Sequence, residues 1–388
     1  MQRNVSSLYI HFPFCKHLCN YCDFYKLKIQ DINNSGDSSL IIDYQNYLQE
    51  SFIINQELLN KNDLKFIPLE TLYIGGGTPS LWGMQGSKFV SNFLGQNKLN
   101  FANDYEFTIE VNPGGWCKEE IESWLEMGVN RFSVGIQTLD ENLLIFLDRV
   151  HTLNDSIETL NFFSKLKINY SVDLMLGLPN SKKFNRNILY ELEKIISYRP
   201  SHFSIYILTT KPNYKYIREL PEEEWVEEEY LKMSDFLSQK GYKQYEVSNF
   251  ALDGFHSKHN FKYWNGSSIA ALGPSAVGFL KLEKEKALRY KWHPRSKQNK
   301  ILFEREDLGI KELSLEYYYL RLRTSSGLGE EDFKDQGDFR EFSRLANNWV
   351  DRNMANYSLS TGKWVLTSKG MLMMDSLMSE LFGYLKCL

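Results

Sequence analysis

Three cysteines near the start of the chain, Cys15, Cys19 and Cys22, stand in the spacing C-x3-C-x2-C. Three thiols so close together indicate a shared partner, because a disulfide would use two of them and leave the third unpaired. A structural zinc site needs four ligands, and His11 or His17 could supply the fourth. An iron–sulfur cluster on three cysteines would instead leave one iron open to a substrate or cofactor. The spacing favours the cluster over zinc.

The composition indicates the class of protein that carries this motif. Of the 388 residues, 43% are hydrophobic and 24% are charged, with a formal net charge of −4, which predicts a globular protein of two or three domains. This charge gives no general attraction to nucleic acid. Five cysteines in such a long chain indicate a reducing, cytoplasmic location. We expect no signal peptide and no transmembrane segment, and peripheral membrane contact stays open.

Short β-rich apolar runs alternate with helical patterns, and these elements must position the cysteines. Six β–α units in series predict a parallel sheet with helices outside it. Because a complete (β/α)8 barrel needs eight units, the expected fold class is α/β with a partial (β/α)6 barrel. The predicted strands are 8–11, 71–74, 107–111, 131–135, 172–176 and 203–207. The predicted helices are 43–59, 88–94, 118–127, 140–147, 154–166 and 185–197.

Other local patterns complete this prediction. The polar residues 33–39 predict a loop in the first crossover. An acidic helix start at 221–229 and a strand at 242–247 follow the barrel. The polar, basic stretch 281–300 predicts a solvated linker rather than a binding patch. Near the end, a strand at 363–367 precedes a final helix from about residue 369.

The cysteine motif and its flanks resemble a known superfamily. C-x3-C-x2-C followed by an aromatic residue, here Phe24, is similar to the radical S-adenosylmethionine (SAM) superfamily. The preceding Tyr9-x-His-x-Pro-Phe resembles the branch that contains oxygen-independent coproporphyrinogen III oxidase and the heme chaperone HemW. The resemblance implies a [4Fe-4S] cluster on Cys15, Cys19 and Cys22, with SAM on the open iron and a low-potential electron donor as a partner.

Groups that bind a ligand are expected at the carboxyl ends of parallel strands. The motif GGGTP at 75–79 follows the second strand; it could bring the backbone close to a ligand or form a tight turn, and it lacks the G-K-[ST] of a phosphate loop. Glu110 in an apolar run needs a partner and could form an ion pair at the rim. Arg149 could be a cation at a helix C-terminus. Further polar residues near strand ends are Gln137, Asp173 and Thr209.

The resemblance implies that these groups together bind SAM. The glycine motif matches the segment for the methionine amino group, Glu110 matches a ribose ligand, and Arg149 can pair with the SAM carboxylate. Tyr9 and Tyr21 match an aromatic pair near the cluster and the adenine, although both could equally be core residues. The implied SAM site consists of Tyr9, Tyr21, Gly76, Gly77, Thr78, Glu110, Gln137, Arg149, Asp173 and Thr209.

A second informative stretch begins at His259, in the sequence H-N-F-K-Y-W. A lone histidine is more often structural than a ligand, but aromatic residues follow this one and histidine is a common axial ligand of heme. His256 is the nearest competing ligand, and the glycine-rich turns at 265–266 and 272–278 could line the same cavity. H-N-x-x-Y-W resembles the HemW segment linked to heme binding. Phe24, where the oxidase has a further cysteine, and the short lead before Cys15 also favour the chaperone.

The resemblance therefore implies a protein that binds heme and delivers it to acceptor hemoproteins. The alternative is an enzyme that oxidatively decarboxylates coproporphyrinogen III, so enzymatic activity stays open, and a third hypothesis is a zinc-stabilised α/β protein. The expected organisation is a radical SAM partial barrel over 1–240, a heme-site segment and linker over 241–300, and a small, mainly helical, winged-helix-like domain over 301–388. A monomer and a homodimer both fit the sequence.

Overall fold

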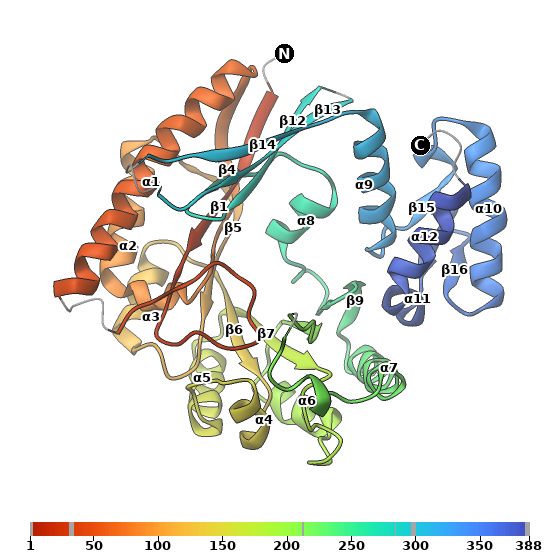
Figure 1. Ribbon diagram of the computed structural model, residues 1–388, viewed down its shortest axis with the longest axis horizontal. Coiled ribbons are helices and arrows are strands. Elements are labelled where there is room, and N and C mark those ends of the chain that lie inside the picture. The colour runs from red at the N-terminus through yellow and green to blue at the C-terminus, as the bar shows by residue number, and fades with distance from the viewer. Residues whose placement is uncertain (1–2, 31–34, 212, 284, 296–299, 385–388) are drawn as a thin grey trace.

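The structure, a computed structural model, describes residues 3–30, 35–211, 213–283, 285–295 and 300–384. A nine-stranded sheet runs in the order β11-β1-β4-β5-β6-β7-β8-β10-β9 (Figure 1). The six strands from β1 to β8 in this order are parallel, β11 joins β1 in parallel, and β10 and β9 close the other side in antiparallel. The bounds are β1 Arg3–Phe12, β4 Leu64–Gly76, β5 Phe101–Val111, β6 Arg131–Gln137, β7 Asn169–Leu176, β8 His202–Ile207, β9 Lys243–Glu246, β10 Asn249–Ala251 and β11 Ala270–Leu272.

This sheet confirms the α/β class and the partial barrel, because each predicted strand lies within an observed parallel strand. Within the residues that the structure describes, the outer strands β11 and β9 are not paired with each other. The carboxyl ends of the six parallel strands lie along one edge of the sheet, as strand-end sites require. These ends are Phe12, Gly76, Val111, Gln137, Leu176 and Ile207.

Helices that follow the strands cover the outside of the curved sheet (Figure 1). They are α1 Ser35–Lys61, α2 Gly83–Gln96, α3 Lys118–Glu126, α4 Glu141–Phe146, α5 Leu153–Leu166, α6 Ile188–Ile196 and α7 Glu223–Gln239. In α5, the Thr152 hydroxyl accepts from the Asp155 amide, and the Asp155 carboxylate accepts from the Thr152 amide. The same helix buries Phe163 against Phe132 of β6, with ring centroids 5.1 Å apart. Each such buried side chain contributes roughly 1.5–3 kcal/mol.

Two local predictions are wrong. The stretch 33–39 is not a loop where the structure describes it, since α1 begins at Ser35, and residues 33–34 lie outside the described ranges. Polar residues there form a helix start, where they are common. The stretch 281–300 is not a linker, because half of it, 281–283 and 286–292, lies in strands of a three-stranded antiparallel sheet, while 296–299 lie outside the described residues. This sheet consists of β12 Val277–Glu283, β13 Lys286–Trp292 and β14 Phe303–Leu308. Leu288, Tyr290 and Trp292 are buried between outward-facing basic residues, as in a sheet with one solvated face.

The last part of the chain has a hydrophobic core of its own. Helices α9 Ile310–Leu322, α10 Gln336–Asp351, α11 Ser368–Leu372 and α12 Met374–Tyr384 surround a sheet of β15 Leu328–Gly329, β17 Lys363–Leu366 and β16 Ala355–Ser358. Leu322, Phe342 and Trp349 are fully buried in this core. The arrangement agrees with a small, mainly helical, winged-helix-like unit. The boundaries at 240 and 300 stay a prediction; β9, β10 and β11 of the segment between them belong to the main sheet.

One short helix departs from the pattern of outer helices. Helix α8 Lys258–Trp264 lies on the inner side of the curved sheet, where it packs on β4 (Figure 1). Ser257 caps it, and the buried Glu106 carboxylate of β5 accepts from the backbone amides of Lys258 and His259 at 2.9 Å each. A carboxylate near a helix N-terminus is favourable, and Arg131 lies 3.9 Å from it.

Among the described residues, no helix is long and apolar enough to cross a membrane.

Candidate functional site

The three cysteines lie in the loop between β1 and α1. A short parallel pair, β2 Phe14–Cys15 with β3 Leu27–Lys28, closes the base of this loop. The ammonium of Lys26 donates to the carbonyl oxygens of Cys19 and Cys22 at 3.0 Å each, and that of Lys211 donates to the Cys22 carbonyl at 2.6 Å. Cys15 is buried, and the other two are half-buried. Both ammonium groups bind backbone carbonyl oxygens, so they hold the loop without contacting the sulfur atoms through these hydrogen bonds.

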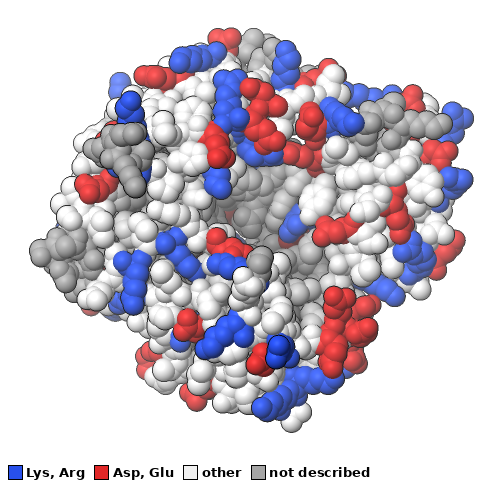
Figure 2. Space-filling model, in the orientation of Figure 1, with Lys and Arg blue, Asp and Glu red and all other residues white. Residues whose placement is uncertain are grey.

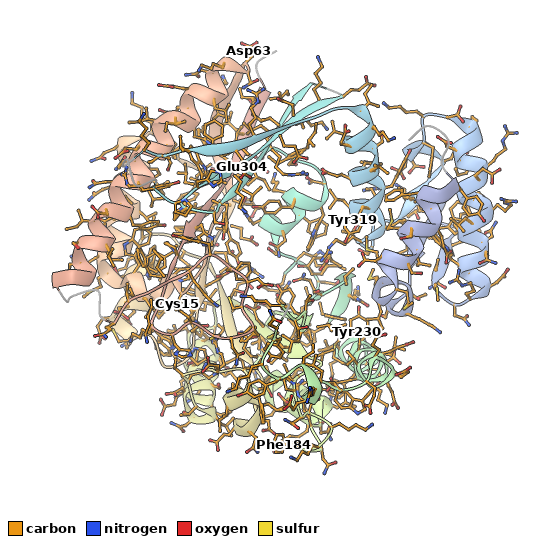
Figure 3. The ribbon with its side chains drawn as sticks, viewed as in Figure 1. Cys15, Asp63, Phe184, Tyr230, Glu304 and Tyr319 are labelled. Carbon is orange, nitrogen blue, oxygen red and sulfur yellow. The ribbon has the colours of Figure 1, made fainter. Side chains whose placement is uncertain are left out.

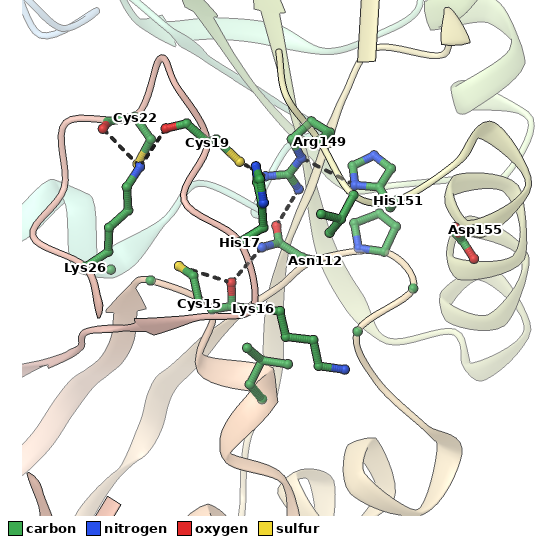
Figure 4. A pocket seen from close by; sticks show the side chains of 18 of the residues that line it. Cys15, Lys16, His17, Cys19, Cys22, Lys26, Asn112, Arg149, His151 and Asp155 are labelled. Atoms are coloured by element: carbon green, nitrogen blue, oxygen red, sulfur yellow. Dashed lines mark hydrogen bonds between the residues drawn. The ribbon is translucent and has the colours of Figure 1, made fainter. Parts of the chain in front are cut away.

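The thiols face a cavity of about 120 Å³ at the carboxyl ends of β1, β4 and β5 (Figure 4). Predicted site residues that line it are Cys15, Cys19, Cys22, Tyr21, Gly76, Gly77, Thr78 and Arg149. Other lining residues include Lys16, His17, Lys26 and Asn112. The structure therefore brings together the predicted cluster ligands, the GGGTP motif and Arg149, which are far apart in the sequence.

The donor set of this cavity fits a cluster held by three thiolates. The Thr78 hydroxyl lies 3.6 Å from the Cys15 sulfur, and the Arg149 guanidinium lies 4.0 Å from the Cys19 sulfur. Burial raises the pKa of Cys15, and the hydrogen bond from Thr78 acts in the opposite direction and only partly offsets it. The charge and hydrogen-bonding groups around the thiols therefore suit metal–thiolate chemistry.

Neither histidine offered for a zinc site is directed to the thiols. His11 uses both ring nitrogens elsewhere, on the Tyr9 hydroxyl at 3.1 Å and the Tyr25 carbonyl at 2.9 Å. His17 pairs with Asp148 at 2.9 Å. Among the described residues, no three His, Cys, Asp or Glu side chains are close enough together to hold a single metal ion. The two histidines are therefore not placed to complete a zinc site with the thiols.

The glycines of the GGGTP motif are required by close packing. Gly76 has a φ of +116°, and a Cβ there would lie 2.5 Å from the His11 ring. A Cβ on Gly77 would lie 2.5 Å from the carbonyl oxygen of Phe14. The backbone of β4 can therefore reach the cysteine loop only with glycine at these positions.

Glu110 joins the same edge of the sheet from β5. Its carboxylate accepts from the Gly76 amide and from the Tyr73 hydroxyl, at 2.9 Å each. Burial raises the pKa of this carboxyl to about 7, although both hydrogen bonds act in the opposite direction. Glu110 forms no ion pair with any residue that the structure describes, so the ion pair at the rim considered from the sequence is not found there. Its hydrogen-bond partners are the Gly76 amide and the Tyr73 hydroxyl.

The raised pKa of Glu110 predicts a pH-dependent effect of Glu110→Gln on stability. Because the carboxyl binds its proton more tightly in the folded than in the unfolded chain, its favourable contribution is complete at low pH and is lost as pH rises through about 7. Glutamine stays neutral, so the variant should have a melting temperature a few °C above that of the wild type near pH 8, at about 2–4 °C per kcal/mol of stability. The increase in melting temperature should be smaller near pH 5. Thermal unfolding of the metal-free chain measures this, and an equal difference at both pH values would refute it.

Asn112 links the predicted residues and was missed from the sequence. Its amide nitrogen donates to the Thr78 hydroxyl at 2.8 Å, and its oxygen accepts from Arg149 at 2.7 Å. Arg149 also donates to the Gly135 carbonyl at 3.1 Å, so the guanidinium is fixed between β5 and β6. Asn112 follows Glu110 by two residues, directly after a strand, and the strand-end rule could have found it.

Six predicted residues do not line the cavity, namely Glu110, whose contacts are given above, and five others. Tyr9 packs among Tyr73 and His259 inside the barrel, with ring centroids 6.0 and 6.3 Å away. Asp173 accepts from the Ser133 hydroxyl at 2.8 Å, and burial raises its pKa. Gln137 ends β6 with a φ of +68°, and Thr209 is exposed after β8. The fifth residue is His259, which is on α8.

His259 is buried at the inner face of the sheet, only 1% exposed. Its Nδ1 is hydrogen-bonded to the Thr71 hydroxyl of β4 at 2.8 Å, while its Nε2 has no hydrogen-bond partner within the described part of the chain. Burial lowers the pKa of this imidazole to about 3, with Arg131 and Lys262 acting in the same direction, so the ring is neutral at physiological pH. A neutral imidazole with one nitrogen held and the other unused is the usual state of a metal-ligating histidine.

The competing histidine has a different environment. His256 is half-buried and stacks on Tyr245, with ring centroids 4.3 Å apart. His259 instead lies among Tyr73 and Tyr263, at 5.2 and 5.4 Å. Thr71 and Glu106, which fix His259 and its helix, were not found from the sequence. No local pattern pointed to them, because both precede α8 by more than 150 residues.

The chain is similar in sequence to a known superfamily and to proteins of known name. The model of the radical SAM superfamily matches residues 9–187. The chain is similar to the heme chaperone HemW of Escherichia coli (strain K12), with 30% identity over 97% of each chain. It is also similar to the heme chaperone HemW of Buchnera aphidicola subsp. Schizaphis graminum, with 32% identity over 70% of this chain and 69% of the relative.

A solved structure is similar over almost the whole chain. It is the coproporphyrinogen III oxidase HemN from Escherichia coli, with a TM-score of 0.74 and 18% identity, covering 99% of this chain and 92% of that one. At this identity the likeness shows a shared fold and no more. The likeness extends over both the main sheet and the C-terminal unit of this chain, since 99% of the chain is covered.

Proposed function

Because this chain belongs to the heme chaperone HemW family of radical SAM proteins, we propose that it binds heme and passes it to acceptor hemoproteins. The family name identifies heme as the ligand, and residues of this chain must then bind it. The feature that carries the proposal is His259, a neutral, buried histidine with Nε2 unused. Heme iron is commonly held by such a nitrogen.

The surroundings of His259 support this role. The Thr71 hydroxyl on Nδ1 fixes the orientation of the ring and directs Nε2 away from β4. Tyr73 and Tyr263 flank the ring, and aromatic walls suit a flat apolar ligand. Glu106 holds the N-terminus of α8 because its carboxylate accepts hydrogen bonds from the Lys258 and His259 amides. The ligand nitrogen is therefore held in place before heme arrives, which lowers the entropy lost on binding.

The superfamily also implies a [4Fe-4S] cluster and SAM, which supply one-electron chemistry when bound. We propose that Cys15, Cys19 and Cys22 hold the cluster in the cavity described above. Backbone amides of the glycine motif, together with Arg149, would bind the charged end of SAM, since a guanidinium pairs well with a carboxylate. Glu110 would accept from ribose hydroxyls. Gln137, Asp173, Tyr9, Tyr21 and Thr209 complete the proposed SAM site.

The experiment that tests the proposal is a heme titration followed by transfer. Anaerobically reconstituted chain, titrated with heme, should develop a stable Soret band. Mixing with an apo-hemoprotein such as apomyoglobin should move the heme to the acceptor. A chain that binds no heme, or binds it without release, would contradict the proposal. Turnover of coproporphyrinogen III in the presence of SAM and a reductant would instead support the oxidase.

The hydrogen bond from Thr71 to His259 predicts a smaller, graded effect. Thr71→Val removes the hydroxyl but keeps a branched side chain, so Nδ1 loses its partner and the ring its fixed orientation. Loss of such a supporting bond typically weakens metal binding 10–100-fold, and we expect a fall in heme affinity of at least about tenfold. Thr71→Ser keeps the hydroxyl and should titrate like the wild type. Equal affinity for both variants would remove Thr71 from the site.

A further inference from the structure

A second, larger cavity lies beyond α8 and away from the cysteines. It has a volume of about 1050 Å³ and lies between α8, the sheet of β12 and β13, and helix α9 with the C-terminal unit. Figure 2 shows the surface hollowed in the region where Figure 1 places α8 and α9. Figure 3 shows Tyr319, which lines this cavity, well apart from Cys15. The cavity is therefore separate from the proposed SAM and cluster site.

The walls of this cavity present apolar surface to solvent. Tyr263, Val277, Ile310 and Tyr317 line it with 36%, 38%, 52% and 41% of their surface exposed. Single exposed apolar side chains are ordinary, but several that converge in one large concavity indicate a ligand or partner. Tyr263 and Val277 form one side, and Ile310 and Tyr317 on α9 form the other. These apolar side chains suit a ligand whose body is apolar.

The cavity and His259 share a wall. Tyr263 lines the cavity, and its ring packs edge to face on the His259 ring at 5.4 Å and 75°. Trp264, next in α8, lines the cavity as well. A ligand in contact with Tyr263 would therefore lie one aromatic ring away from the His259 ring. The turn at 265–266, expected to line the same cavity as His259, lies along this larger space.

Charges around the cavity are mixed. Three lining residues are basic and six are acidic; the basic ones are Lys281, Arg289 and Lys334, and the acidic ones are Glu285, Glu316, Glu331, Asp332, Asp335 and Asp338. The carboxylates of Glu316 and Glu285 are already paired, with Arg289 and Lys334 respectively. Figure 2 shows both colours around the hollow. Cations among the lining residues can receive the carboxylates of a ligand whose body is apolar.

We propose that this cavity holds the porphyrin plane of heme, with a propionate directed to Lys281 on β12 and with Tyr263 as the movable wall between the porphyrin and His259. The inference rests on the proposed heme function and adds where the macrocycle lies. Iron ligation by His259 then requires the Tyr263 side chain to turn aside. Binding of the porphyrin in the cavity and ligation of the iron by His259 can therefore be measured separately.

Two cavity-filling variants test this inference. Val277→Trp and Ile310→Trp enlarge exposed side chains on opposite walls, so the core is not disturbed. Leu359→Trp, at a residue that is 91% exposed and outside the cavity, is the matched control. The probes are heme, whose binding is followed by absorbance, and iron-free protoporphyrin, whose binding is followed by the change in its fluorescence. Cluster absorbance and circular dichroism confirm that each variant is folded.

We expect both filled variants to lose at least tenfold in affinity for either porphyrin, while Leu359→Trp binds like the wild type. His259→Ala should keep its affinity for the iron-free porphyrin and lose affinity for heme. Wild-type affinity in both folded Trp variants would overturn the inference while leaving the heme function standing. A wild-type chain that binds no heme would overturn the proposed function itself, and the inference with it.

Discussion

Cys19→Ala is expected to abolish the iron–sulfur cluster. Cys19 lines the cavity at the strand ends, half-buried, with the Arg149 guanidinium 4.0 Å from its sulfur. A cluster held by only three thiolates has no protein ligand to spare, so one substitution should remove most of the iron, about four atoms per chain in the wild type. Iron analysis and the visible absorbance of the anaerobically reconstituted chain measure this loss.

The chain offers a matched control in Cys117. This thiol is exposed at the start of α3 and does not line the cavity, so Cys117→Ala should keep full iron content. The fold should survive Cys19→Ala, since Lys26 and Lys211 hold the loop through backbone carbonyls that the substitution leaves in place. Stoichiometric zinc without iron in the wild type would contradict the cluster and revive the zinc hypothesis.

His259→Ala is expected to give the largest loss of heme affinity. Removing a hydrogen-bond partner of a metal-ligating histidine typically weakens binding 10–100-fold, so removing the ligand should exceed about 100-fold. The Soret band should also shift or broaden, because the iron loses its axial nitrogen. A heme titration of the reconstituted variant measures both effects, with cluster absorbance as the check that the barrel is intact.

His256→Ala is the control for this result. His256 is three residues earlier and half-buried, and it stacks on Tyr245 rather than among the tyrosines of the barrel interior. Loss of the His256 side chain should leave the heme affinity and the Soret band unchanged. A normal Soret band in His259→Ala, with the band lost in His256→Ala, would transfer the ligand role to His256. An unchanged band in both variants would place the iron ligand on another residue.

Much of the site could be predicted because the parallel barrel follows a local rule. Each predicted strand was found, and the residues at strand ends meet at one edge. Thr78 and Glu110 could be placed at that edge for this reason, whereas Arg149, which follows α4, was assigned to the site through the family resemblance. Asn112, the side chain that joins Thr78 to Arg149, followed the same rule and was overlooked. The error at 281–300 had another cause, because charge suggested a linker where alternating burial of Leu288, Tyr290 and Trp292 makes a strand.

The sequence by itself determined the thiol set and the α/β class. Spacing within one loop keeps Cys15, Cys19 and Cys22 together whatever the rest of the chain does, and the alternation of strand and helix patterns is a local property. Only the tertiary structure decided how His259 is placed. Its partner Thr71 is 188 residues away, its helix is held by Glu106 on another strand, and Tyr263 separates it from a cavity closed by α9. Contacts of that range depend on how whole elements pack, and no local pattern of residues encodes them.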